Sequence, residues 1–146
     1  MSADFYLGNP NLKKVGTEIQ FTKDQIQEYL KCKEDPVYFA MTYIKIISLD
    51  EGIVPFKMWD FQQELIESFH ENRFNIAKLP RQTGKSTTCV SYLLHYILFN
   101  DNVNVGILAN KLSTARDLLG RLQLAYEHLP MWLQQVLSYI TKEVWS

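Results

Sequence analysis

The segment LPRQTGKST, residues 79–87, is a near match to a phosphate-binding loop. The usual pattern is G-x-x-x-x-G-K-[ST], in which backbone N–H groups surround phosphate oxygens and the lysine supplies positive charge. Gly84, Lys85 and Ser86 provide the second half of this pattern. Leu79 stands where the first glycine belongs, and Arg81 adds a second cation inside the loop. The segment therefore indicates phosphate binding by a variant loop.

Each residue type in this loop suits phosphate chemistry. Lys85 would reach the outer phosphates, and the Ser86 hydroxyl would bind Mg²⁺. Gln82 and Thr83 would contribute mainly backbone N–H groups, and Gly84 would let the backbone approach phosphate closely. Thr87 would bond an α-phosphate or cap the helix that follows, and both roles stay open. The alternative for the whole segment is a strand-to-helix turn with a solvated lysine.

The hydrophobic pattern places the loop between a strand and a helix. Residues 73–79 form a short apolar run of strand length, and residues 85–99 have the period of a buried helix. Residues 104–109 form a second such run, and a helix with a candidate N-cap at Ser113 follows. This order of elements predicts an α/β fold, an incomplete P-loop NTPase with a parallel sheet and flanking helices.

A helical N-terminal segment is predicted before the loop. One helix should begin after Thr22, a plausible N-cap. A second should begin at Pro36 with Asp35 as its cap, and its apolar face continues to Ile47. A third helix is expected over roughly residues 59–72.

The composition is that of a chain able to form one compact domain. Of the 146 residues, 47% are hydrophobic and 21% are charged. The formal net charge is −1, and no run of like charge marks a nucleic-acid surface. Cys32 and Cys89 have no zinc-site spacing, which indicates free thiols in a reducing compartment. Without a signal peptide or a bilayer-length apolar stretch, we expect a protein that is not secreted and has no membrane partner.

Beyond the loop, the sequence resembles the large terminase subunit of tailed double-stranded DNA bacteriophages, the motor that packages DNA into empty heads. The loop of that family carries Arg-Gln-x-Gly-Lys-[ST], and residues 81–86 match it at every position. The resemblance continues in PFKMWDFQQELIESF upstream and in VNVGILANKLSTARDLLGRL downstream. It is closest to the terminases of T-even-type phages and covers roughly residues 36–135.

The resemblance implies ATP and Mg²⁺ as cofactors and gives roles to two further residues. Arg81 would sense or stabilise the γ-phosphate, with a salt bridge to a nearby carboxylate as its alternative. Gln62 stands where the family places a glutamine that reads the N6 and N7 edge of adenine. Trp59 or Phe61 would stack on the base. Gln63 competes for the reading role, and an ordinary surface glutamine is the alternative for Gln62.

Parts of the family pattern are missing. No apolar strand ending in Asp-Glu, which would hold Mg²⁺ and activate water, follows the second apolar run. Arg81 and Lys85 would then be the catalytic residues present, and we expect nucleotide binding without hydrolysis at a motor's rate.

The expected organisation is therefore that of an N-terminal piece of a longer protein. A loose arm would cover residues 1–20, and a helical segment with the adenine-side helix would cover residues 21–72. The start of a P-loop ATPase core would cover residues 73–146, truncated before the Walker B strand and without the nuclease domain.

The resemblance also implies partners for the full-length parent: double-stranded DNA, the portal protein and the small terminase subunit, in the host cell cytoplasm. Lys111 would be a DNA-facing cation, with a solvated loop as its alternative. An exposed sheet edge would make the isolated piece oligomeric or dependent on a C-terminal partner piece. Two other interpretations stay open: another P-loop NTPase such as a small-molecule kinase, and a truncated product that binds nucleotide or partners without turnover.

Overall fold

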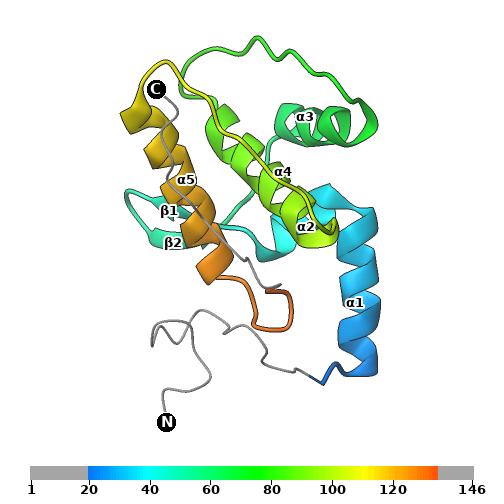
Figure 1. Ribbon diagram of the computed structural model, residues 1–146. Coiled ribbons are helices and arrows are strands. Elements are labelled where there is room, and N and C mark those ends of the chain that lie inside the picture. Colours follow the sequence, from blue (N-terminus) through cyan, green and yellow to red (C-terminus); the bar gives the residue numbers. More distant parts are fainter. Residues whose placement is uncertain (1–19, 135–146) are drawn as a thin grey trace.

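The computed structural model describes residues 20–134, which form helices around a central helix and one β-hairpin (Figure 1). The helices are α1 (Lys23–Glu34), α2 (Pro36–Tyr43), α3 (Asp60–Glu71), α4 (Lys85–Phe99) and α5 (Leu112–Glu127). The strands are β1 (Lys45–Ser48) and β2 (Gly52–Pro55). Apart from its last residue, the predicted arm over residues 1–20 lies outside the described part.

The first two helices begin where their capping residues predict. The Thr22 hydroxyl accepts the Gln25 N–H at 3.2 Å, and the Gln25 side chain accepts the Thr22 N–H at 3.0 Å. A carboxylate oxygen of Asp35 accepts the Tyr38 N–H at 2.9 Å, with Pro36 at the first helical position. These bonds satisfy N–H groups that have no partner within the helix. Both predicted helix starts are confirmed.

The chain turns into a hairpin directly after α2. Strands β1 and β2 pair antiparallel, with Ile46 opposite Val54. The Ser48 hydroxyl accepts N–H groups in the turn, and Gly52 has φ +77°, a conformation that favours glycine. The predicted continuation of the second helix to Ile47 is wrong. The β-branched residues after Tyr43 favour extended backbone, and here they pair across the hairpin.

Helix α4 lies at the centre of the described structure. It contacts α2, α3 and α5, and it begins at Lys85 and ends at Phe99 as predicted. Helix α5 runs in the same general direction as α4, and the segment over residues 100–111 returns along α4 to join them (Figure 1). The N-cap of α5 is Lys111 rather than the predicted Ser113.

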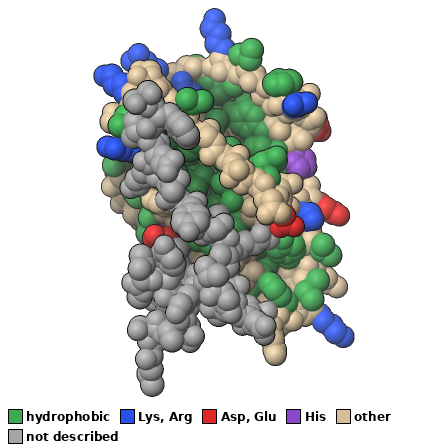
Figure 2. Space-filling view, viewed as in Figure 1, with side chains coloured by type: hydrophobic (Ala, Val, Ile, Leu, Met, Phe, Trp, Pro, Cys, Tyr) green, Lys and Arg blue, Asp and Glu red, His purple; other side chains and the backbone are tan. Residues whose placement is uncertain are grey.

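The core gathers around the second half of α4. Leu94 and Leu98 are fully buried there, together with Phe39 of α2 and Ile66 of α3. Figure 2 shows hydrophobic side chains in the middle of one face and Lys and Arg side chains mainly along its upper rim. The apolar groups therefore anchor α4 from several sides.

The predicted α/β fold, an incomplete P-loop NTPase with a parallel sheet, is wrong. Within residues 20–134 the only sheet is the antiparallel β1–β2 hairpin, and the structure is mostly helical. Residues 73–79 and 104–109, the expected parallel strands, have no hydrogen-bonded ladder. Phe74, Ile76 and Leu108 are 83%, 101% and 97% exposed. A strand needs backbone hydrogen bonds to a neighbour, and an apolar run does not by itself supply one.

His95 of α4 is a buried polar ring in this core, 2% exposed. Its Nε2 lies 2.8 Å from the carbonyl oxygen of Cys32. Because a carbonyl oxygen only accepts hydrogen bonds, Nε2 must carry the ring proton. Nδ1 then carries no proton in the neutral ring. The ring centroid lies 5.5 Å from that of Phe39 and 4.7 Å from that of Phe99. Burial disfavours the charged ring and lowers the pKa of His95 to about 4.

This pKa predicts acid destabilisation in a defined window. The unfolded chain protonates histidine near pH 6.5, whereas the folded chain does so near pH 4. Between these values the unfolded state binds more protons, so the free energy of unfolding falls as pH falls. The histidine contribution should reach roughly 2 kcal/mol by pH 5. The pKa of Glu28 is also lowered, because the Tyr38 hydroxyl donates to its carboxylate, so its protonation destabilises the fold in the same direction as pH falls.

Urea denaturation at pH 7.5 and pH 5 measures the effect. His95→Gln keeps an amide donor for the Cys32 carbonyl and should show a flatter dependence on pH than the wild type. His128→Gln, which removes a half-buried histidine of another segment, is measured beside it as the control. Equal pH dependence in His95→Gln and the wild type would contradict the assignment.

Candidate functional site

The loop before α4 has a backbone of alternating handedness. Gln82 has φ +61° and Gly84 has φ +69°, while Thr83 between them is not in the positive-φ region. Gly84 is left-handed at ψ 16°, and Lys85 after it is right-handed helical. Paired residues of opposite handedness turn successive N–H groups toward one side and form an anion-binding concavity. The loop thus has a backbone suited to phosphate.

The first turn of α4 leaves its N–H groups available. The first bond of the helix runs from the Thr88 N–H to the Gly84 carbonyl at 3.0 Å. The N–H groups of residues 85–87 precede it, and no side chain in the described part caps them. Unpaired N–H groups and the positive end of the helix dipole favour an anion at this position.

The predicted cations lie on the exposed side of the loop. Lys85 is exposed, and its Nζ donates to the Leu79 carbonyl at 3.5 Å, so its side chain lies back along the loop. Arg81 is exposed and forms no ion pair with any residue between 20 and 134. Its alternative role as a salt bridge at the loop base therefore has no counterpart there. Ser86, the predicted Mg²⁺ ligand, is half-buried in the first turn of α4.

Two threonines brace the loop internally. The Thr83 hydroxyl donates to the Pro80 carbonyl at 3.0 Å, which closes the turn. The hydroxyl of Thr88, fully buried, donates to the Gly84 carbonyl at 2.9 Å. Sequence reasoning missed Thr88. The available signal was a threonine four residues after the loop glycine, where a hydroxyl can bond back to that carbonyl.

Gln62 joins the first turn of α3 to the loop. Its Oε1 accepts the Trp59 N–H at 3.0 Å, and its Nε2 donates to the Thr83 carbonyl at 3.1 Å. The residue is 6% exposed. Trp59 is exposed and stands edge-on to Phe61 at a centroid distance of 5.9 Å. Adenine reading by Gln62, or by the half-buried Gln63, stays a prediction. The structure brings Gln62 to the loop backbone.

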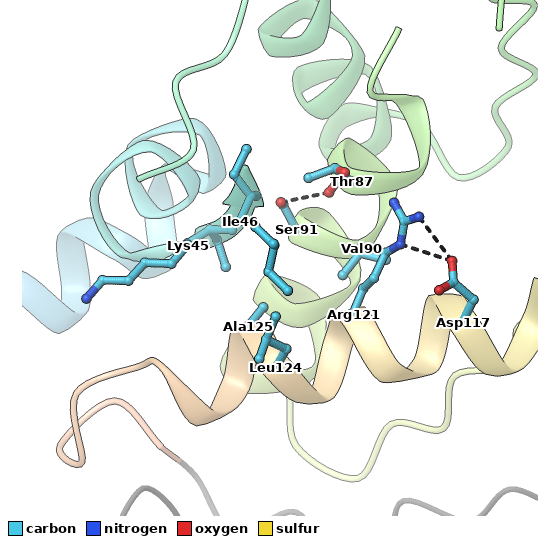
Figure 3. Close-up of a pocket in the computed structure, with 11 residues that line it drawn as sticks. Lys45, Ile46, Thr87, Val90, Ser91, Asp117, Arg121, Leu124 and Ala125 are labelled. Atoms are coloured by element: carbon cyan, nitrogen blue, oxygen red, sulfur yellow. Dashed lines mark hydrogen bonds and ion pairs between the residues drawn. The ribbon is translucent and has the colours of Figure 1, made fainter. Parts of the chain in front are cut away.

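A cavity of about 350 Å³ lies beside the loop, between β1, α4 and α5 (Figure 3). Thr87 is the one predicted site residue among those that line it, and its carbonyl accepts the Ser91 hydroxyl at 2.8 Å. Arg121 and Asp117 form an exposed ion pair of 3.0 Å at the cavity. Gln62 and the loop over residues 80–86 do not line the cavity. Apart from Thr87, the predicted phosphate-binding residues therefore lie outside this cavity.

The other predicted contact residue, Lys111, lies directly before α5. Lys111 is exposed, and its carbonyl accepts the N–H groups of Thr114 and Ala115 at the start of α5. Its backbone thus begins a helix, and a DNA-facing role for its side chain stays a prediction.

The groups that the loop offers are of the types that a magnesium–triphosphate group would require. Phosphate would be held by backbone N–H groups of the loop and by Lys85, and the Ser86 hydroxyl is an oxygen ligand of the kind that Mg²⁺ accepts together with phosphate oxygens and waters. Residues 20–134 contain no cluster of three or more His, Cys, Asp or Glu side chains arranged to hold a metal. A bound Mg²⁺ would neutralise part of the negative charge on the phosphates.

No protein-family model matches the chain. In the described part, no helix combines the length and the apolar character needed to cross a bilayer.

Substitution of Gly84 should disturb the loop for two reasons. A side chain at φ +69° costs about 1–2 kcal/mol, and a Cβ there would lie 2.5 Å from the Gln62 Nε2. That nitrogen is held by its bond to Thr83, so it cannot withdraw freely. We expect Gly84→Ala to lower the free energy of unfolding by roughly 1–3 kcal/mol.

Gly120→Ala is the matched control. Gly120 lies inside α5 with open space around it, so alanine should stabilise by about 0.5–1 kcal/mol. Urea titration measures the free energy of unfolding of both variants. Adding Gln62→Ala to Gly84→Ala should recover the part of the lost stability that is due to the clash. Wild-type stability in Gly84→Ala would contradict the loop geometry.

Proposed function

We propose that the chain binds Mg-ATP through the loop over residues 80–87. The observation that carries this proposal is the left-handed Gly84 followed directly by the uncapped first turn of α4. Lys85 begins that turn, so a cation and several N–H groups lie within one short segment. Such a combination favours a multiply charged anion over a neutral ligand.

The proposal is local and does not depend on a parallel sheet. Its elements are the loop, the first turn of α4 and the contact with α3 through Gln62. Helix α4 is anchored in the core by Leu94 and Leu98, which holds its first turn in place without adjacent strands.

Within this proposal each side chain has a distinct task. Lys85 neutralises charge on the outer phosphates, and Ser86 supplies a hydroxyl for Mg²⁺. Arg81, exposed and without an ion pair in the described range, reaches toward the γ-phosphate. The exposed Trp59 provides an apolar face for a base.

The wider proposal follows the resemblance in residues 36–135. The chain would be the nucleotide-binding N-terminal part of a phage terminase large subunit. Its parent would work in the host cell cytoplasm with double-stranded DNA, the portal protein and the small terminase subunit. The Arg-Gln-x-Gly-Lys-[ST] match supports this assignment, and the loop geometry supports its nucleotide-binding component.

Lys85→Ala should remove most of the affinity for nucleotide. Hydrogen bonds to charged groups contribute about 1.5–3 kcal/mol, which corresponds to roughly a 10- to 100-fold loss. Calorimetric titration with a non-hydrolysable ATP analogue and Mg²⁺ measures it. Lys78→Ala removes the same charge from the exposed segment before the loop and should bind as the wild type does. Equal affinities of Lys85→Ala and the wild type would contradict the proposal that the loop binds nucleotide.

Arg81→Ala should separate ATP from ADP. Because Arg81 has no partner among the described residues, its loss should change the free energy of unfolding by no more than about 0.5 kcal/mol. Affinity for the triphosphate analogue should fall about tenfold, while affinity for ADP stays unchanged. Arg116→Ala, an exposed arginine of α5, is the control. Equal losses for both nucleotides would show that Arg81 does not act on the γ-phosphate.

A further inference from the structure

Gln62 is a buried side chain whose two functional atoms both serve backbone groups. Its Oε1 faces an N–H donor, that of Trp59, and its Nε2 faces a carbonyl acceptor, that of Thr83. The two partners determine which end of the amide is oxygen and which is nitrogen. With 6% of the residue exposed, the amide has little surface left for an external ligand.

The bond to Thr83 has a direct consequence for the loop. A trans peptide is planar, with its C=O and N–H pointing in opposite directions. Because the Thr83 carbonyl points to Gln62, the N–H of Gly84 in the same peptide points away from Gln62 and α3. Holding the carbonyl therefore sets the direction of one of the N–H groups of the phosphate loop.

The close approach of Gly84 strengthens this control. A Cβ on Gly84 would lie 2.5 Å from the Gln62 Nε2, so the loop backbone lies directly against the amide. The peptide cannot rotate freely without breaking the 3.1 Å bond or meeting the side chain. The other end of the amide is bound to the start of α3, so the contact ties the loop to a packed helix.

We propose that Gln62 is a positioning residue for the phosphate loop, which orients the Thr83–Gly84 peptide through the Thr83 carbonyl. This inference rests on the proposed function for its ligand, and it states how phosphate affinity is set. It assigns the effect of Gln62 to the phosphates, which every nucleoside triphosphate shares, and not to the base. Adenine reading by the same side chain predicts a different result and is an outcome of the test.

Inorganic triphosphate distinguishes the two roles because it has no base. Calorimetry with magnesium and inorganic triphosphate, an ATP analogue and a GTP analogue is carried out on the wild type, Gln62→Met and the control Gln63→Met. Gln62→Met keeps the length of the side chain and removes the amide. We expect it to weaken all three ligands by the same factor, about tenfold. Gln63→Met should bind inorganic triphosphate, which has no base to read, within about twofold of the wild type.

Amide hydrogen exchange tests the loop without any ligand. Gln62→Glu keeps an acceptor for the Trp59 N–H but replaces the donor to Thr83, and Gln63→Glu adds the same charge one residue further on. Exchange of the Thr88 N–H, which bonds the Gly84 carbonyl, should accelerate at least about tenfold in Gln62→Glu and Gln62→Met, and not in Gln63→Glu.

Each result has a definite meaning. A loss in Gln62→Met that is confined to the ATP analogue would assign Gln62 to the base and overturn the positioning role. Unchanged exchange of the Thr88 N–H in both Gln62 variants would overturn it as well. If the wild type binds none of the three ligands, the proposed function fails, and the exchange experiment alone decides whether Gln62 holds the loop.

Discussion

The burial of α4 among α2, α3 and α5 is the constraint on which the described structure depends. Its second half carries the fully buried Leu94 and Leu98, so this end cannot shift without opening the core. An α-helix is a stiff rod with a rise of about 1.5 Å per residue, and anchoring one half places the other half. The first turn therefore has a defined position even though Lys85 is exposed. A helix held in this way can present its unpaired N–H groups to a ligand without losing its own packing.

Polar side chains of α4 extend this anchoring to the segments around it. His95 bonds the carbonyl of Cys32 at the end of α1, and Thr88 bonds the carbonyl of Gly84 in the loop. Buried polar groups are costly without partners, and backbone carbonyls satisfy these two. The same bonds restrict what α4 can do relative to α1 and to the loop. Gln62 adds a restraint from α3, so the loop is braced from two helices at Gly84 and at its neighbour Thr83.

The helices could be predicted from sequence and the sheet could not, because the two depend on signals of different range. The bonds of Thr22 and Asp35 join residues three apart, so short stretches of sequence contain the whole capping interaction. The start of α4 follows in the same way from a glycine directly before a helical run. A strand is defined by a partner elsewhere in the chain, and the apolar runs over residues 73–79 and 104–109 contain no information about that partner. The hairpin was missed for the converse reason, since Ile47 also fits the helical period of the residues before it.

The candidate site divides along the same line. Gly84, Lys85 and Ser86 could be singled out from their types and order, because the left-handed glycine and the helix start lie within a few consecutive residues. The contact of Gln62 with Thr83 spans 21 positions, and no local pattern predicts that an amide on one helix will orient a peptide in a distant loop. Sequence alone places Gln62 on a helix before the loop, where a side chain aimed at a base and one aimed at the backbone have the same spacing. Only the burial of the amide and the identity of its two partners separate these roles. The residue types of the candidate site can therefore be recognised within one short stretch of sequence. The orientation of the loop backbone, by contrast, depends on how α3 packs against α4.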